Sequence, residues 1–474
     1  MSFNIKIFKK RFSKRQFDIE SPNKKVICTI KMRDGRIFYE VKKENTILVR
    51  ESKLGFLLRG ESELGVNLNL VRTQKKTCNE VFETIVGEQK EVRNNYNEMA
   101  VYVAEESEKK RLFSLRFRVF NDGVAFRYEV PPQPSFQRII IEDELTEFNV
   151  DLNGQAWRIP AYQATKYELN YERWPVYELR DAVHTPLTIE TNTNKYLAIH
   201  EAALYNYGSM TLKLNQDKRL QADITPLSDG VKAYVDLPFN SPWRVIYVAD
   251  SAIELTVNRM LLCLNEPAKE DFSWVKPLKF LGIWWAMYVG EWTWAEGKKH
   301  GASTEHAKQY LDWCMKLGVS GLLVEGWNNG WSGEWSLNGK YTDFLHPVAD
   351  FEMEQVAEKA RVSNVELVAQ HETVGQIDNY EQLESAFSYL VSNGIHYVKT
   401  GYTGSKMMIA GKQEYHHSQV GVLHYQKTVE MAARYQIMLN IHEPIKGTGI
   451  ERTYPNILTR EGAKGQEYEG GKIR

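Results

Sequence analysis

The sequence predicts a chain of two main parts, an N-terminal β-sandwich followed by a (β/α)8 TIM-type barrel. Short runs of alternating apolar and polar residues recur between turn signals over residues 1–255. Apolar strands alternate with amphipathic helices over residues 276–474. Between them, residues 256–275 are expected to form a linker helix, because the stretch from Ala252 is apolar at helical spacing and Pro267 closes it.

Composition narrows the classes of function. With 474 residues, 43% hydrophobic and 26% charged, the chain can bury the core of two or three globular domains. A net charge of −1 without a basic block gives no indication of a nucleic-acid partner. No apolar run is long enough to span a membrane, and the N-terminus lacks the apolar core of a secretory signal. The four cysteines lie far apart, so they indicate neither zinc nor a disulfide framework.

The N-terminal part is predicted to be almost entirely β. Strands are expected at 25–32, 37–42, 112–120, 124–130, 196–200, 231–235 and 244–248. Hairpin turns are expected at residues 33–35 (Arg-Asp-Gly) and 121–123 (Asn-Asp-Gly). Glu201 follows one of these strands in the sequence HEAALYNY, and taken alone it suits a structural role.

The C-terminal part alternates strands and helices, and about five such units are visible. Strands are expected at 280–285, 320–325, 365–369, 397–400 and 437–441. Helices are expected at 304–317, 351–362, 380–393 and 420–435. The first of these helices has Ser303 or Thr304 as its N-cap and Gly318 as its stop.

Polar or aromatic residues follow each of these strands. In chain order they are Trp284 and Trp285, Glu325, His371 and Glu372, Lys399, and His442 and Glu443. Five successive strands that end in this way are typical of an active site at the carboxyl end of a barrel. The segment from His442 to Glu469 is the densest part of this pattern, with further carboxylates at Glu461 and Glu467.

Several carboxylates beside aromatic rings, without a nucleophile motif, favour glycoside hydrolysis. That reaction uses one protonated acid and one carboxylate that acts on water or on the sugar. Eight of the twelve tryptophans lie between residues 284 and 335, where they either stack on sugar rings or form core. Clustered carboxylates repel one another, so a cation is expected, and oxygen-only ligands suit Ca²⁺.

Six motifs resemble glycoside hydrolase family 97, most closely its inverting α-glucosidase branch. They are HEAALYNY, VEGWNNGW, AQHET, VKTG, HEPIKGTGIERTYPN and REGAKGQEYE. The resemblance implies a β-sandwich before a (β/α)8 barrel, a Ca²⁺ ion in the active site, an oligosaccharide substrate and a periplasmic location. It gives no oligomeric state. Family members continue through three more barrel strands, so the barrel of this chain is expected to be incomplete.

The same resemblance assigns roles residue by residue. It implies that Glu467 is the general acid and that Glu372 and Glu443 are the base carboxylates. The implied Ca²⁺ ligands are Glu201, Glu443, Glu461 and Glu467. The implied sugar contacts are Gln370, His371, His442, Glu325, Lys399 and Trp285.

Gly401 separates two mechanisms. Retaining members of the family carry an Asp nucleophile after the fourth barrel strand, where this chain has Gly401. Glycine cannot attack an anomeric carbon, so the sequence predicts that water attacks and that the configuration is inverted. In inverting enzymes the two catalytic carboxyl groups stand about 6.5–9.5 Å apart, which leaves room for that water. Two alternatives stay open, a retaining α-galactosidase of the same family and a truncated, non-catalytic carbohydrate-binding product.

Overall fold

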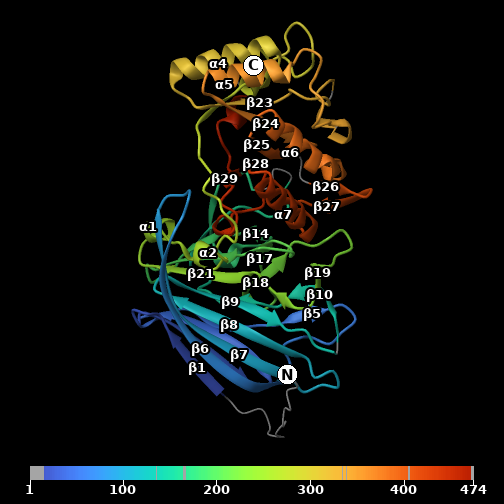
Figure 1. Ribbon diagram of the computed structural model, residues 1–474. Helices are drawn as coiled ribbons and strands as arrows, with labels where there is room; N and C mark the ends of the chain where they lie inside the picture. The colour runs from blue at the N-terminus through green and yellow to red at the C-terminus, as the bar shows by residue number, and fades with distance from the viewer. Residues whose placement is uncertain are drawn as a thin grey trace.

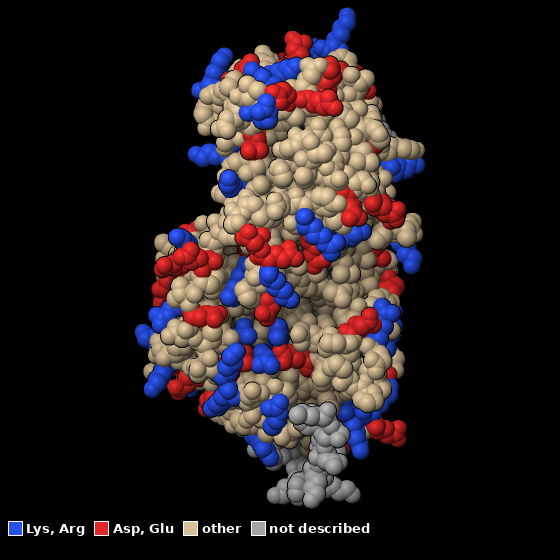
Figure 2. All heavy atoms as spheres, viewed as in Figure 1, with Lys and Arg blue, Asp and Glu red and all other residues tan. Residues whose placement is uncertain are grey.

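The computed structural model has two lobes, a sheet-rich N-terminal lobe and a C-terminal lobe of mixed helices and strands (Figure 1). It describes residues 15–134, 136–163, 167–333, 335–337, 339–403 and 406–470. On the face shown in Figure 2, acidic and basic side chains are interspersed over the sheet-rich lobe. In the described part of the chain, no helix is both long and apolar enough to cross a membrane.

An antiparallel sheet of ten strands is the largest element of the sheet-rich lobe. Its order is β13-β12-β15-β16-β21-β9-β8-β7-β6, with β20 paired to β9. The strands are β6 (Leu68–Glu83), β7 (Glu91–Glu105), β8 (Leu112–Phe120), β9 (Gly123–Val130), β12 (Gln155–Arg158), β13 (Glu172–Pro175), β15 (Leu187–Glu190), β16 (Tyr196–Ala202), β20 (Phe239–Asn240) and β21 (Trp243–Ala249).

Three smaller sheets complete this lobe. They are β1 (Arg15–Glu20), β2 (Val26–Arg33), β3 (Arg36–Lys43) and β4 (Thr46–Lys53); β5 (Phe56–Leu58), β10 (Arg138–Glu144) and β19 (Ala233–Asp236); and β11 (Glu147–Phe148), β14 (Val183–His184), β17 (Met210–Leu214) and β18 (Leu220–Ile224). Tyr39 of β3 packs on Phe126 of β9 with ring centroids 4.8 Å apart, so facing sheets share one core. The predicted sheet-rich N-terminal domain is confirmed.

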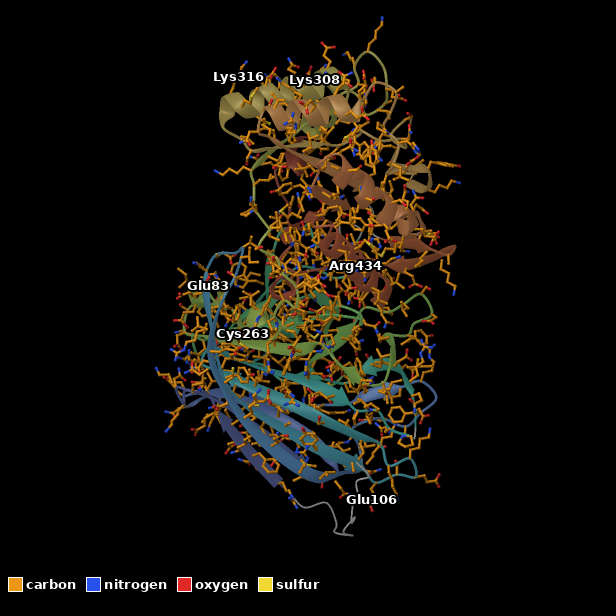
Figure 3. All side chains as sticks on the ribbon, viewed as in Figure 1. Glu83, Glu106, Cys263, Lys308, Lys316 and Arg434 are labelled. Carbon is orange, nitrogen blue, oxygen red and sulfur yellow. The ribbon has the colours of Figure 1, made fainter. Side chains whose placement is uncertain are left out.

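Local signals placed several strands correctly and missed the longest hairpin. β8 has the predicted bounds, and Asp34 and Gly35 have φ of 51° and 68° in the turn between β2 and β3. The β6–β7 hairpin was not predicted, because most residues of β6 are exposed and polar and show no alternation. Figure 3 labels Glu83 and Glu106, which mark the two ends of this long ribbon.

The predicted single linker helix is wrong. Residues 252–263 form two short helices, α1 (Ala252–Thr256) and α2 (Met260–Cys263). Asn258 lies between them, and its side chain accepts a hydrogen bond from the backbone N–H of Met260 (2.8 Å). That side-chain bond competes with helical continuation. Both helices pack on the ten-stranded sheet rather than spanning the lobes freely.

The C-terminal lobe is built on a parallel sheet that resembles half of a barrel. Its order is β22-β23-β24-β25-β28-β29. The strands are β22 (Phe280–Gly282), β23 (Gly321–Val324), β24 (Glu366–Glu372), β25 (Tyr397–Gly401), β28 (Met438–His442) and β29 (Ile457–Glu461). The sequence predicted five of these strands and missed β29, most of whose residues are only partly buried or exposed.

Helices cover one face of this sheet (Figure 1). They are α4 (Thr304–Leu317), α5 (Met353–Val362), α6 (Leu383–Ser392) and α7 (Gln419–Arg434). The short helix α3 (Trp284–Tyr288) and the final turn α8 (Glu467–Gly470) lie instead at the carboxyl ends of the strands. The short 3-10 turns of the chain are η1 (Val176–Glu178), η2 (Trp335–Leu337), η3 (Gly339–Tyr341), η4 (Ile377–Gln382) and η5 (Ile450–Arg452), and a hairpin joins β26 (Lys406–Ile409) to β27 (Lys412–Tyr415).

Helix α4 has the predicted bounds because its caps are explicit in the sequence. The Ser303 hydroxyl accepts from the His306 N–H at 3.2 Å, and Gly318 adopts the left-handed conformation that ends the helix. By contrast, the predicted strand 280–285 is only three residues long, and Trp284 and Trp285 already belong to α3.

Candidate active site

A cavity of about 250 Å³ lies at the carboxyl ends of the parallel strands. Five of its carboxylates come from different elements of the C-terminal lobe: Glu325 after β23, Glu372 at the end of β24, Glu443 after β28, Glu461 at the end of β29, and Glu467 on α8. The sequence predicted all five as site residues. The parallel register explains why they meet, since the ends of neighbouring strands reach the same edge of a sheet.

Lys399 of β25 lies among these acids. Its Nζ is 3.0 Å from Glu325 Oε1 and 3.4 Å from Glu461 Oε2. Burial opposes the charge of Lys399, but Glu325 and Glu461 hold its pKa above the ordinary value. Burial raises the pKa of Glu325, against the pull of Lys399. Lys399 therefore neutralises part of the charge of the cavity.

Glu372 is the most firmly held carboxylate of the site. It is 3% exposed, and its oxygens accept hydrogen bonds from the backbone N–H groups of Val374 (2.5 Å) and Thr403 (3.0 Å). His442 Nε2 lies 3.6 Å from Glu372 Oε2. Backbone donors stabilise the ionised form, so the arrangement suits a fixed negative charge or a base.

Glu467 has the opposite environment. Partial burial raises the pKa of its carboxyl, and the nearby charge of Glu461 raises it further. Glu168 and Glu325 act in the same direction, while Lys399 opposes them. A carboxyl that keeps its proton to higher pH is the form that a general acid requires.

Gln370 and His442, the next two predicted sugar contacts, both line the cavity. Gln370 Nε2 lies 3.3 Å from His442 Nε2, and Gln370 Oε1 is buried without a hydrogen-bond partner in the structure. A buried acceptor without a partner is costly unless a ligand supplies a donor. A sugar hydroxyl is such a donor.

His371 does not reach the cavity, which corrects its predicted role as a sugar contact. Side chains alternate along β24, so Gln370 and Glu372 face the cavity and His371 faces the helices. Its ring is fully buried and stacks on Phe344 (centroids 4.1 Å apart) and on Phe387 of α6 (5.6 Å). Burial lowers the pKa of His371 to about 3, so the ring is a neutral core group.

Trp285 does not fill its predicted role as a sugar contact either, because the neighbouring Trp284 takes its place at the cavity. Because α3 begins at Trp284, the ring that lines the cavity belongs to Trp284, while Trp285 does not line it and is 39% exposed. The two rings meet edge to face at 5.2 Å. This segment was predicted to be a strand, but in a helical turn successive side chains point in other directions than they do in a strand.

Glu201 lies apart from the other predicted metal ligands. It is fully buried in β16, where its carboxylate accepts from Arg244 Nη1 at 2.8 Å and from the Met210 N–H at 2.7 Å. Lys446 Nζ is 3.0 Å from Oε1 of Glu201. Burial would raise the pKa of Glu201, but Lys446 and Arg244 lower it, so the carboxylate stays charged inside an ion network.

Several residues of the cavity were not predicted as site residues. Trp331 stacks on Trp294 with centroids 4.9 Å apart, and Trp335 lies 5.0 Å from Trp331. The tryptophan enrichment between residues 284 and 335 was the signal for Trp294 and Trp335, and Trp331 also lies in the motif VEGWNNGW. The remaining wall includes Tyr288, Thr403, Tyr468 and, from the sheet-rich lobe, Glu168. No sequence pattern marked Glu168, because its position depends on how the two lobes meet.

Family models match both parts of the chain. The model described as Glycosyl-hydrolase 97 N-terminal matches residues 19–267, and the one described as Glycoside hydrolase 97 matches residues 284–463. The chain belongs to glycoside hydrolase family 97. The predicted family is therefore confirmed.

Solved structures agree with this assignment. A family 97 enzyme from Pseudoalteromonas sp. strain K8 in complex with acarbose is 37% identical, with a TM-score of 0.92 over 96% of this chain and 70% of that one. A variant enzyme from the same strain, in complex with panose, gives the same identity, TM-score and coverage.

The names of the curated relatives give retaining α-galactosidase activity and not the predicted α-glucosidase activity. A retaining α-galactosidase from Bacteroides thetaiotaomicron is 22% identical over 96% of this chain and 68% of its own length. A probable retaining α-galactosidase from Streptomyces bingchenggensis is 23% identical over 91% of this chain and 62% of its own. This chain thus spans about two thirds of the length of its relatives.

The residues present fit only in part the calcium ion that the resemblance to family 97 implies. Glu443, Glu461 and Glu467 share the cavity, and their oxygens are of the type that Ca²⁺ prefers. Glu201 instead holds two side-chain cations in the other lobe. Among the residues that the structure describes, no group of three or more His, Cys, Asp and Glu is placed to hold a metal. The four expected ligands are therefore not assembled as one site.

Proposed function

We propose that this protein is an inverting α-glucosidase that cleaves terminal α-glucosidic bonds of maltooligosaccharides. The observation that carries the proposal is Gly401 at the end of β25, beside Glu372 in the register of the sheet. Retaining members of the family are expected to carry an Asp nucleophile at this position. A glycine supplies no nucleophile, so the attacking group is water.

The surroundings of Gly401 also leave no place for a nucleophilic side chain at this position. Gly401 has φ of +148°, and a Cβ there would lie 2.1 Å from the carbonyl oxygen of His442. A side chain cannot be accommodated without moving β28. The sequence predicted that the glycine leaves room for water, but the adjacent backbone of β28 takes up that space.

The proposed mechanism divides the carboxylates by environment. Glu467, whose pKa is raised, donates a proton to the leaving oxygen of the glycoside. Glu372 and Glu443 hold a water molecule and take its proton as the water attacks the anomeric carbon from the opposite face. The bond between the anomeric carbon and the leaving oxygen breaks as the new bond forms, so the configuration inverts.

The substrate class rests on the aromatic wall and on the solved relatives. Trp294 and Trp331 stack on each other at the cavity and Trp335 packs against them at an angle, and aromatic faces of this kind suit the apolar faces of sugar rings. The relatives from Pseudoalteromonas bind acarbose and panose, and panose consists of α-linked glucose units. An oligosaccharide of α-linked glucose is the substrate proposed here.

Retaining α-galactosidase activity is the second candidate. It is favoured by the names of the curated relatives at 22% and 23% identity, and Gly401 opposes it. The assay compares maltose with an aryl α-galactoside and follows the first sugar product by proton NMR. Maltose should give β-glucose first, whereas release of α-galactose would establish the second candidate. Binding of maltose without turnover of either substrate would instead indicate a carbohydrate-binding product.

The variant Glu467→Gln tests whether Glu467 is the general acid. We expect it to abolish hydrolysis of maltose, which needs a protonated leaving group, and to impair an activated aryl α-glucoside much less. Glu469→Gln is a matched control on the same turn. Equal losses on both substrates would remove Glu467 from the acid role.

Binding of Ca²⁺ is proposed separately, on the chemistry of the donors. Glu443, Glu461 and Glu467 line the same cavity but are not placed as a metal site among the described residues, so they would have to draw together around the ion, which would offset their mutual repulsion. Titration calorimetry of the protein with Ca²⁺, and its melting temperature with and without EGTA, should both show binding. No heat of binding and no change in melting temperature would end this proposal.

A further inference from the structure

The turn that carries Glu467 is held by two tyrosine hydroxyls. The Tyr288 hydroxyl donates to the backbone carbonyl oxygen of Glu467 at 2.7 Å. The hydroxyl of Tyr468, the next residue, donates to Glu168 Oε2 at 2.6 Å. Because α8 has only four residues, it has little internal stability, and these two contacts fix its position at the cavity.

Glu168 comes from the other lobe, between β12 and β13, and its neighbour makes a second contact with the barrel. The Tyr167 hydroxyl donates to the carbonyl oxygen of Pro444, the residue after Glu443. The ring of Tyr167 is wedged between His184 (centroids 5.2 Å apart) and His417 (5.0 Å). Tyr167 is therefore anchored by packing on both lobes.

Through the consecutive residues Tyr167 and Glu168, these contacts connect the segment of the proposed base Glu443 to the turn of the proposed acid Glu467. Tyr167 holds the residue that follows Glu443, and Glu168 holds the residue that follows Glu467. The distance between a base and an acid across the sugar determines whether a water molecule fits between base and anomeric carbon. A short rigid connection between them would fix that distance.

We propose that Tyr167 and Glu168 are positioning residues that set the separation of Glu443 and Glu467, so that the sheet-rich lobe determines the geometry of the acid and the base. This inference rests on the proposed function. Both residues act through their neighbours and not on the reacting atoms. The sheet-rich lobe is then part of the catalytic apparatus and not only a support for the barrel.

The test uses conservative variants of the full chain. Tyr167→Phe and Tyr468→Phe each remove one hydroxyl, and Glu168→Ala removes the acceptor. Each should lower kcat on maltose by about ten-fold or more, because misplaced catalytic groups cost up to about a hundred-fold, while KM stays within about three-fold. Glu168→Gln, whose amide oxygen still accepts a hydrogen bond, should recover most of the loss. Tyr171→Phe, in the same segment and 58% exposed, should behave as wild type.

Combination of the changes separates positioning from general damage. Glu168→Ala together with Tyr468→Phe should be no slower than either single variant, since both break the same contact. Wild-type kcat in Tyr468→Phe and Glu168→Ala, or losses that multiply in the double variant, would overturn the inference. Tyr468 is half-exposed, so its variant tests the idea even if Tyr167→Phe fails to fold.

The Glu467→Gln variant in the same assay keeps the two proposals apart. If Glu467→Gln retains full activity on maltose, the proposed function fails. If Glu467→Gln is inactive while the bridge variants match wild type, only the positioning inference fails.

Discussion

Gly401 shows how a single residue without a side chain restricts a mechanism. Its φ of +148° is a backbone conformation that L-residues rarely adopt, and the His442 carbonyl oxygen occupies the place of a Cβ. Both the backbone angle and the contact require glycine, independently of any catalytic role. The close approach of β25 and β28 therefore leaves no room for an Asp side chain at position 401.

Gly401→Asp should therefore not convert the enzyme to a retaining one. We expect loss of activity and a lower melting temperature, with a cost on the order of 2–4 kcal/mol from strain and overpacking. Gly394→Asp is the matched control, because Gly394 has φ of +73° and nothing lies within 4 Å of its Cβ position. A stable Gly401→Asp enzyme that releases α-glucose first would contradict the argument.

The residues that the sequence misplaced share a physical cause. The motif Gln370-His371-Glu372 marks the end of a strand but not which side chains face the cavity, and the period of two puts His371 on the helix side. Trp285 was displaced because a helical turn replaced a predicted strand end. Glu325 and Lys399, which lie at the ends of single strands, do line the cavity, and their predicted contact with sugar stays a prediction.

At the scale of elements, accuracy followed local signals. Helix α4 carries its own N-cap and C-cap, so its bounds could be derived from the sequence. Strands β6 and β29 lack alternation, because the first is largely solvated and the second is supported by β28 alone. Their formation depends on pairing with distant strands, which one sequence does not reveal.

The ion network around Glu201 links β16 and β21 to the loop after Glu443. Glu144 and Glu201 share Arg244, whose Nη2 is 2.5 Å from Glu144 Oε2, and Lys446 supplies the second positive charge. Burial lowers the pKa of Lys446, yet the carboxylate of Glu201 counters this, so the two acids face two cations. The network is neutral only while Lys446 is present.

Lys446→Met should leave one buried carboxylate uncompensated. The expected cost is about 3–5 kcal/mol of unfolding free energy, the usual penalty for removing one partner of a buried pair. Urea unfolding measures it, with Lys464→Met as the control because Lys464 is exposed. A change below about 1 kcal/mol in Lys446→Met would show that the loop, rather than the charge, accommodates the loss.

For the whole molecule, buried histidines predict how stability depends on pH. Burial lowers the pKa of His371 to about 3 and of His424 to about 3. Burial, with the charge of Lys446, lowers the pKa of His200 to about 4. These side chains belong to both lobes, so acid affects the whole fold rather than one part.

The sign follows from proton uptake. In the unfolded chain each histidine binds a proton near pH 6.5, whereas in the folded chain it does so only near pH 3–4. Between these values the unfolded state binds more protons, so the stability that is present above pH 6.5 is lost as pH falls toward 4. The loss is about 1.4 kcal/mol per pH unit for each histidine.

We therefore expect urea unfolding at pH 7, 6 and 5 to show a steep fall in stability, which His371→Leu reduces by about 1.4 kcal/mol per pH unit below 6.5. His371 is the best probe, because its ring has only apolar stacking partners and both of its nitrogens are buried without a hydrogen bond. Leucine removes the titrating group and keeps an apolar side chain of similar size. His346→Leu, the same substitution at an exposed position, is the comparison variant. The same slope in His371→Leu and wild type would mean that His371 takes up its proton in the folded protein. The stacked position between Phe344 and Phe387 would then open in acid.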